Sequence, residues 1–317
     1  MSEDDSMSEE NNRIEEAVQT QQIPETDAPA ETPAEAAQPE RKRSPRTQKI
    51  ITGLIMSAIV LLLIYFGNAV FAVVAIVVVC LSLYEEYDAM SKAGHRLVCW
   101  PTWVAAVVSI PLALIYQSRV LIPILMACCL VTLLCILFRS EPRLVDALMS
   151  VCPLFFVLLP GLGIISLATV QPLSVQRTLN GLLIAVPVLG DTMAFFVGSK
   201  VRGPKLCPAV SPNKTVSGAI AGLVGSLMAA LITRGIAELF CVANKSLLPG
   251  WWAVIALGLI GGVAAQAGDL FASLVKRHCG IKDFSNLFPG HGGMMDRLDS
   301  VLFMALVLMC YRLFALA

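Results

Sequence analysis

Residues 250–273 read GWWAVIALGLIGGVAAQAGDLFAS, an apolar run in which Asp269 is the one charged residue. A bilayer core of about 30 Å needs roughly 20 apolar residues in a helix, so this run is long enough to cross it. An ionised carboxylate inside such a span is costly, and it usually faces a polar cavity and serves a function. The stretch therefore predicts a transmembrane helix that carries part of a functional site.

The rest of the chain continues this pattern. Only 15% of its 317 residues are charged, whereas soluble domains carry about a quarter, so the composition favours a membrane protein. We predict an all-α polytopic membrane protein with about nine transmembrane helices. The spans are expected near residues 50–66, 69–83, 100–116, 120–138, 148–169, 180–199, 216–240, 250–273 and 296–316.

The positions of lysine and arginine predict the orientation. With a cytoplasmic amino terminus, the outer loops hold only Arg119, Arg177 and Lys245, and the basic loops all lie inside. The positive-inside rule then places the amino terminus in the cytoplasm and, with nine spans, the carboxyl terminus outside. We expect an integral protein of the bacterial inner membrane with its active site on the cytoplasmic side.

Three regions follow from composition. Residues 1–46 are polar, first acidic and then basic, with few core-forming side chains, so we expect a disordered cytoplasmic tail. Residues 47–170 should hold about five transmembrane helices. Residues 171–317 should form the catalytic region, with about four helices and cytoplasmic loops. None of the ten cysteines forms a CxxC pair, so we interpret them as small apolar residues rather than zinc ligands.

Four aspartates should meet near the inner surface. Asp191 interrupts the sixth span, Asp269 the eighth, and Asp296 and Asp299 open the ninth. Asp191 lies nine residues before Lys200 and Asp269 seven before Lys276, which is roughly 10–14 Å along a helix. The ninth span runs in the opposite direction, so Asp296 and Asp299 at its start should lie at the same depth in the bilayer. Such a cluster suits either a hard cation such as Mg2+ or a transported cation.

The neighbouring loops favour the first use. One loop includes Ser211, Lys214 and Thr215 just before a predicted helix start near residue 215, a typical anion site. The other joins cations to Pro289-Gly290 and Gly292-Gly293, whose backbone N–H groups can approach an oxyanion. Basic inner loops more often only obey the positive-inside rule, but cations beside carboxylates suggest Mg2+ holding a polyphosphate. A cation transporter gains nothing from so many positive charges.

The final loop also resembles a known family. The pattern Ser273-x-x-Lys276-Arg277-x4-Lys282-Asp283-x5-Pro289-Gly290-His291-Gly292-Gly293-x-x-Asp296-Arg297-x-Asp299 closely resembles the signature of phosphatidate cytidylyltransferases. Two further blocks, Asp191-Thr192-x-Ala194-Phe195-x-x-Gly198 and Ser211-Pro212-x-Lys214-Thr215-x-x-Gly218, are similar to the same family. The likeness covers roughly residues 180–310. The Tyr84-Glu85-Glu86-Tyr87 cluster more loosely resembles an acidic-aromatic patch of that family, to which the sequence assigns no role.

The chain departs from the family pattern at three positions. Met193 stands where glycine is usual, Val216 where tryptophan is frequent, and Ser217 where Glu or Gln is usual. These positions flank the polar residues of the pattern, so the departures bear on substrate fit rather than on the class of reaction.

The resemblance implies Mg2+-dependent transfer of a cytidylyl group from CTP to phosphatidate, giving CDP-diacylglycerol and pyrophosphate. It implies that Asp269 and Asp296 carry the metal, with Asp299 and Asp191 as further ligands. Ser211 and Lys214 would hold the triphosphate, while Lys276, Arg277, Lys282 and Arg297 would share the pyrophosphate and the lipid phosphate. The remaining expected substrate-binding residues are Thr215, Ser273, Asp283, His291, Gly292 and Gly293. Asp269, Asp296, Lys276 and Arg297 are the expected catalytic residues.

Other functions remain open at this point. A CTP-dependent kinase for a polyprenol, or a cytidylyltransferase for an ether lipid, would share the metal site, although an alcohol nucleophile needs a nearby base. An ion-coupled transporter would also use intramembrane acids, but it predicts an inverted repeat that the sequence does not show. CTP, phosphatidate and membrane lipids are the expected partners, with no nucleic acid. A homodimer and a second cation stay open.

Overall fold

The computed structural model describes residues 58–59, 61–62, 64–66, 68–115, 121–240, 246–288 and 292–315. All of them belong to one compact unit, Arg43–Ala317. The predicted tail at 1–46, most of the first predicted span at 50–66, and His291 lie outside the described residues.

The described chain is helical apart from one two-stranded hairpin and an isolated β-bridge. Its elements, in chain order, are α3 (Asn68–Lys92), α4 (Trp100–Ile115), α5 (Leu121–Leu137), α6 (Leu144–Pro153), the π-helical turn η2 (Leu154–Leu158), α7 (Leu159–Leu167), α8 (Leu173–Val201), β1 (Lys205–Cys207), β2 (Ser211–Thr215), α9 (Val216–Phe240), α10 (Trp251–His278) and α11 (Met295–Ala315).

Six described helical segments are long and apolar enough to cross a bilayer. They are Ala69–Lys92, Leu144–Leu167, Leu173–Val201, Val216–Phe240, Trp251–His278 and Met295–Ala315. Each overlaps a span predicted from the sequence, and α4 and α5 are shorter apolar helices at two further predicted positions. The protein is therefore an integral membrane protein built from helices, as expected, because helices satisfy their backbone groups internally. The count of nine spans and the orientation stay predictions.

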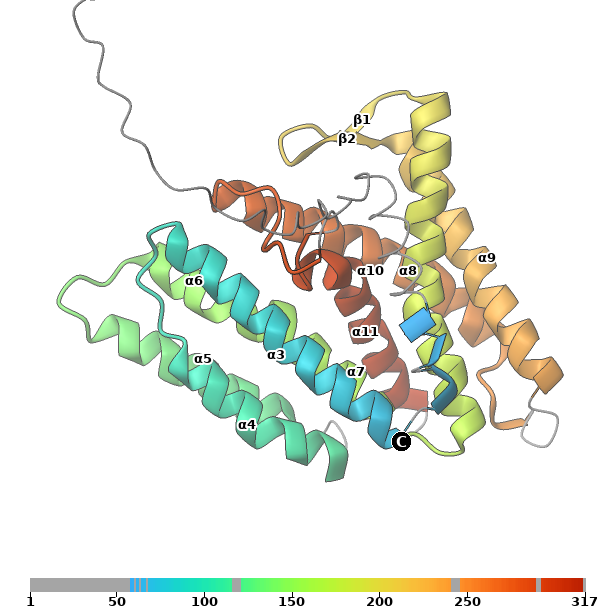
Figure 1. Cartoon of the computed structure of the whole chain (residues 1–317), viewed down its shortest axis with the longest axis horizontal. Helices are drawn as coiled ribbons and strands as arrows, with labels where there is room; N and C mark the ends of the chain where they lie inside the picture. Colours follow the sequence, from blue (N-terminus) through green and yellow to red (C-terminus); the bar gives the residue numbers. More distant parts are fainter. Residues whose placement is uncertain are drawn as a thin grey trace, which may run out of the picture. The chain divides into compact units, whose positions relative to one another are not determined.

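Helices α8 to α11 pack closely together (Figure 1). Helix α8 lies against α9, and α10 contacts α8, α9 and α11. Buried Ser226 of α9 donates its hydroxyl hydrogen to the backbone oxygen of Val186 on α8, at 3.1 Å. Small residues and such interhelical hydrogen bonds are typical of helix contacts in membranes. This group of helices contains all four predicted aspartates.

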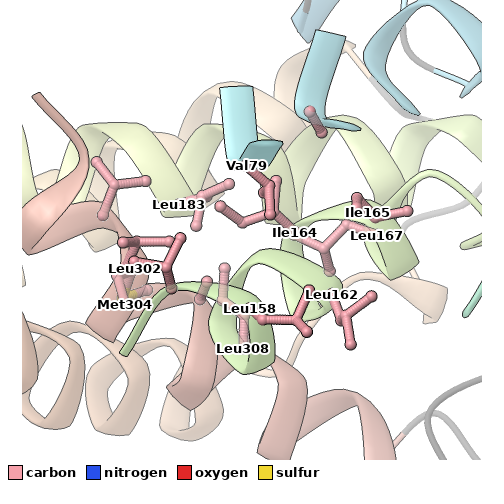
Figure 2. Close-up of a cluster of buried hydrophobic side chains, with 14 of the residues drawn as sticks. Val79, Leu158, Leu162, Ile164, Ile165, Leu167, Leu183, Leu302, Met304 and Leu308 are labelled. Atoms are coloured by element: carbon pink, nitrogen blue, oxygen red, sulfur yellow. The ribbon is translucent and has the colours of Figure 1, made fainter. Parts of the chain in front are cut away.

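A buried apolar core joins the amino-terminal helices to this group. Figure 2 shows side chains of α3, η2, α7, α8 and α11 meeting there, among them Val79, Leu158, Leu162, Leu183, Leu302 and Leu308. Because lipid tails are as apolar as leucine, this core stabilises the fold through close packing rather than through exclusion of water. Helix α11 contacts α3, α7, α8 and α10, so it occupies a central position in the packing.

The β1–β2 hairpin connects α8 to α9. Its strands are antiparallel, with Lys205 opposite Thr215 and Cys207 opposite Ser211. Thr215, buried, accepts a hydrogen bond at its Oγ1 from the backbone N–H of Gly218, 3.1 Å away. A threonine whose side chain accepts a hydrogen bond from the backbone N–H three residues later is a typical helix N-cap. The expected start of a helix near residue 215 is thus confirmed.

Candidate active site

A cavity of about 810 Å³ lies where α8, the hairpin, α9 and α10 meet. Asp191, Lys214 and Asp269 all line it, together with Arg202, Lys205 and Gln266. Lys214 Nζ lies 2.5 Å from Oδ2 of Asp269, and these two side chains are 26% and 28% exposed. The hairpin therefore brings a lysine onto an aspartate of α10 inside a cavity large enough for a small ligand.

Helices α10 and α11 cross very closely beside Asp269. A Cβ at Gly268 would collide with the backbone oxygen of Asp299 and would lie 2.9 Å from the ring of Phe303. Only glycine allows this approach, which is a common way for membrane helices to pack. As a result the backbone of Asp299 lies directly beside the residue that precedes Asp269.

Ser300 connects the acids of α8 and α11. Its hydroxyl lies 3.3 Å from Oδ2 of Asp191 and 3.4 Å from Oδ1 of Asp299, with geometry for donation to either. The structure thus brings Asp191, Asp269 and Asp299 together from three helices. Topology and helix rise suggested a group of four acids that also included Asp296.

Asp296 has a different environment from the other three acids. It is 8% exposed, and its Oδ1 lies 2.8 Å from Lys276 Nζ. Its Oδ2 accepts hydrogen bonds from the backbone N–H groups of Phe284 and Gly293, at 2.8 and 2.9 Å. Both oxygens are therefore engaged, and the side chain ties the α10–α11 loop, residues 279–294, to the start of α11.

The other predicted site residues are more dispersed. Ser273 is half-buried on α10, one turn after Asp269, and Ser211 begins β2 outside the cavity lining. Thr215 lines the cavity but also caps α9. Gly292 and Gly293 belong to the α10–α11 loop. Arg277, Lys282, Asp283 and Arg297 are exposed around this loop.

Sequence reasoning assigned no role to Glu85, which reaches this loop from α3. Its carboxylate accepts hydrogen bonds from the Ser285 hydroxyl and from the backbone N–H groups of Met294 and Met295. The signal in the sequence is the Tyr84-Glu85-Glu86-Tyr87 cluster near the end of an apolar span, which loosely resembles an acidic-aromatic patch of the family. Nothing in that pattern shows that Glu85 contacts residues 200 to 210 positions away.

The donor chemistry of the acids fits a hard divalent cation. Asp191, Asp269 and Asp299 offer only oxygen ligands, which Mg2+ prefers, and Mg2+ is usually held by one or two carboxylates plus substrate phosphates. Among the described residues, no group of three or more His, Cys, Asp or Glu side chains has the spacing of a complete metal site.

The fold and site define an integral membrane protein with a cavity lined by carboxylates and lysines. Residues 47–315 match the Cytidylyltransferase family. The chain is 34% identical over 264 residues to a phosphatidate cytidylyltransferase of Brucella melitensis biotype 1, across 82% of this chain and 90% of that protein. It is 42% identical over 113 residues to a phosphatidate cytidylyltransferase of Bacillus subtilis, across 36% of this chain and 39% of that protein. The chain belongs to the cytidylyltransferase family.

Proposed function

We propose that this protein is a phosphatidate cytidylyltransferase, which converts CTP and phosphatidate into CDP-diacylglycerol and pyrophosphate. The observation that carries the proposal is that Asp191, Asp269 and Lys214 line one cavity. Asp299 lies close to Asp191, because the Ser300 hydroxyl is within 3.4 Å of both carboxylates. These residues lie inside the segment that matches the family. Carboxylates next to lysines suit a nucleotide triphosphate held with a divalent cation.

The reaction needs positioning more than proton transfer. A phosphate monoester has its second pKa near 6, so the lipid phosphate is largely dianionic at neutral pH and already a nucleophile. One of its oxygens forms a bond to the α-phosphorus of CTP, while the bond from that phosphorus to the bridging oxygen breaks. The electron pair leaves with pyrophosphate, and no general base is required. The protein would act mainly by orientation and charge stabilisation.

The described residues suggest a division of roles. Lys214 reaches the cavity from the hairpin and would hold the triphosphate, with Arg202 and Lys205 close by in the cavity lining. Lys276, at 2.8 Å from Asp296, would approach either the leaving pyrophosphate or the lipid phosphate. Arg277, Lys282 and Arg297 surround the loop and would attract both anions.

Mg2+, when bound, would neutralise phosphate charge at the carboxylates. Asp269, Asp191 and Asp299 are the ligands that the geometry favours, because they group around the cavity and the α10–α11 crossing. Asp296 remains a candidate ligand, but its two oxygens already accept from Lys276, Phe284 and Gly293.

We also propose that the site faces the cytoplasm from the bacterial inner membrane. The carboxyl ends of α8 and α10 and the amino end of α11 carry Lys200, Lys276, Arg277 and Arg297. Cationic helix ends and loops favour the cytoplasmic side. CTP would then enter from the cytoplasm and phosphatidate from the inner leaflet.

Two positions of radiolabel on CTP test the reaction class. In detergent micelles with phosphatidate and Mg2+, label at the α-phosphate should enter the lipid product, and label at the γ-phosphate should leave as pyrophosphate. A parallel reaction replaces phosphatidate with a polyprenol. Transfer of the γ-label to the polyprenol, with no α-label in any lipid, would show a CTP-dependent lipid kinase and refute the proposal.

A further inference from the structure

Glu85 of α3 lies against the start of α11 and the loop that precedes it. Glu85 is only 5% exposed. Its Oε1 accepts from the Ser285 hydroxyl at 2.6 Å and from the Met294 N–H at 3.0 Å. Its Oε2 accepts from the Met295 N–H at 2.8 Å. All three of these partners come from the α10–α11 loop or from the first residue of α11.

These contacts complete a continuous set of backbone hydrogen bonds. The N–H of Gly293 donates to Asp296, and the next two N–H groups, of Met294 and Met295, donate to Glu85. Free N–H groups at a helix start attract an anion, and the helix dipole adds to that attraction. Here two carboxylates of the protein fill that position, one from α11 itself and one from the distant helix α3.

The sequence suits this arrangement at Gly293. A Cβ at this position would lie 2.6 Å from Oε2 of Glu85 and 2.8 Å from the Ser285 hydroxyl. Any larger residue would push the carboxylate away from the loop. Gly293 is therefore required for close approach of Glu85, whereas the sequence alone suggested close approach of a substrate oxyanion.

We propose that Glu85 is a positioning residue of the active site. It anchors the α10–α11 loop and the first turn of α11 to α3. It thereby fixes the positions of Asp296 and Lys276, whose side chains form an ion pair at 2.8 Å. The role of these two groups in cytidylyl transfer rests on the proposed function. The anchoring of the loop by Glu85 does not depend on it.

The negative charge of Glu85 is part of this role. All three partners are hydrogen-bond donors, and each carboxylate oxygen receives at least one backbone N–H. In Glu85→Gln the amide NH2 would replace one oxygen and face the N–H of Met294 or Met295, donor against donor. A buried donor left without an acceptor is costly, so the loop should loosen although the side chain keeps its size.

The first measurement compares amide hydrogen exchange in wild type and Glu85→Gln by mass spectrometry of the peptide that contains residues 292–297. We expect at least tenfold faster exchange in the variant. Asp88→Asn is the matched control, because Asp88 lies on the same helix and pairs with Lys92 near the surface, 2.6 Å away. Exchange in the control should equal that of wild type.

Steady-state kinetics with CTP and phosphatidate form the second measurement. We expect kcat of Glu85→Gln to fall about 100-fold, since small displacements remote from the chemistry can cost that much. The KM for CTP should change less than threefold. A merely structural role would reduce the yield of folded enzyme and leave kcat per folded molecule unchanged.

Ser285→Ala keeps the proposal testable should Glu85→Gln fail to fold. It removes one of the three contacts, so we expect a smaller fall in kcat, about fivefold, with faster exchange of the same peptide. In the double variant, Ser285→Ala should lower kcat little beyond the effect of Glu85→Gln alone, because the Ser285 hydroxyl acts through Glu85. Wild-type exchange in Glu85→Gln, or a lower kcat without faster exchange, would overturn the inference. An inactive wild type with a loosened loop in the variant would instead refute only the cytidylyltransferase assignment.

Discussion

Asp269 combines a close ion pair with access from the cavity. Its partner Lys214 lies 2.5 Å away, yet both side chains remain about a quarter exposed. A carboxylate that served only to balance a lysine would not need to face a cavity with two further acids nearby. The contacts instead suit a group that would exchange its lysine partner for a divalent cation, while the lysine would pair with the phosphate.

Asp269→Asn should therefore lower kcat by about 100-fold or more, since the variant loses one negative charge where the cation is expected. Asp269→Glu should keep more activity and require a higher Mg2+ concentration for half-maximal rate. Rates at a series of Mg2+ concentrations measure both effects. Glu141→Gln, at an exposed surface position, is the control. Full activity in Asp269→Asn would remove this residue from the site.

Thr215 supports the hairpin through its cap on α9. Thr215→Val keeps the shape of the side chain but removes the oxygen, and it should lower the free energy of unfolding by about 1 kcal/mol. Thr215→Ser should lower the free energy of unfolding much less. Denaturation in mixed micelles of dodecyl maltoside and SDS measures the difference. Equal stability of both variants would show that the cap contributes little.

At the scale of elements, the crossing of α10 and α11 sets the distance between acids on different helices. Gly268 permits that crossing, because the backbone of α11 occupies the space where a Cβ would be. Phe271 and Phe303 pack with Phe156 on the same region, with ring centroids 4.6 and 5.6 Å from that of Phe156. Asp269 and Asp299 thus lie on helices that also pack through aromatic side chains.

Gly268→Ala should separate the two helices and lower kcat more than tenfold, with a loss of stability of about 1–3 kcal/mol from overpacking. Gly235→Ala on α9 is the matched control, because no atom lies within 4 Å of a Cβ at that position. Activity and thermal unfolding of both variants in micelles provide the comparison. A wild-type kcat in Gly268→Ala would show that the distance between Asp269 and Asp299 is not critical.

At the scale of the whole molecule, orientation decides which compartment supplies the nucleotide. The six long apolar segments and the two shorter helices α4 and α5 are compatible with several numbers of crossings. Nine spans with a cytoplasmic amino terminus place the carboxyl terminus outside.

Fusions at Ala317 test this orientation. Alkaline phosphatase fused there should be active, because it folds only outside the cytoplasm. Green fluorescent protein fused at the same position should not fluoresce, because it would be exported. A second pair of fusions inserted after Cys207, in the hairpin, should behave in the opposite way. Fluorescence from the carboxyl-terminal fusion would contradict nine spans with a cytoplasmic amino terminus.

The sequence by itself determined the helical membrane class, because long apolar runs have few other stable structures in a bilayer. It also predicted that Asp191, Asp269, Asp296 and Asp299 lie near one depth, since helix rise and the alternation of loops set how far each residue lies from the surface. The start of α9 after Thr215 followed from local chemistry.

Only the tertiary structure decided which polar groups meet. Asp296 binds Lys276 and two backbone N–H groups, and Glu85 binds a loop more than 190 residues away. His95 and His278 place their Nε2 atoms 2.9 Å apart although they are 183 residues apart in the chain. Periodicity and spacing report the depth and the helix face of a residue. They carry no information on which helices lie side by side, and that depends on close packing such as that at Gly268.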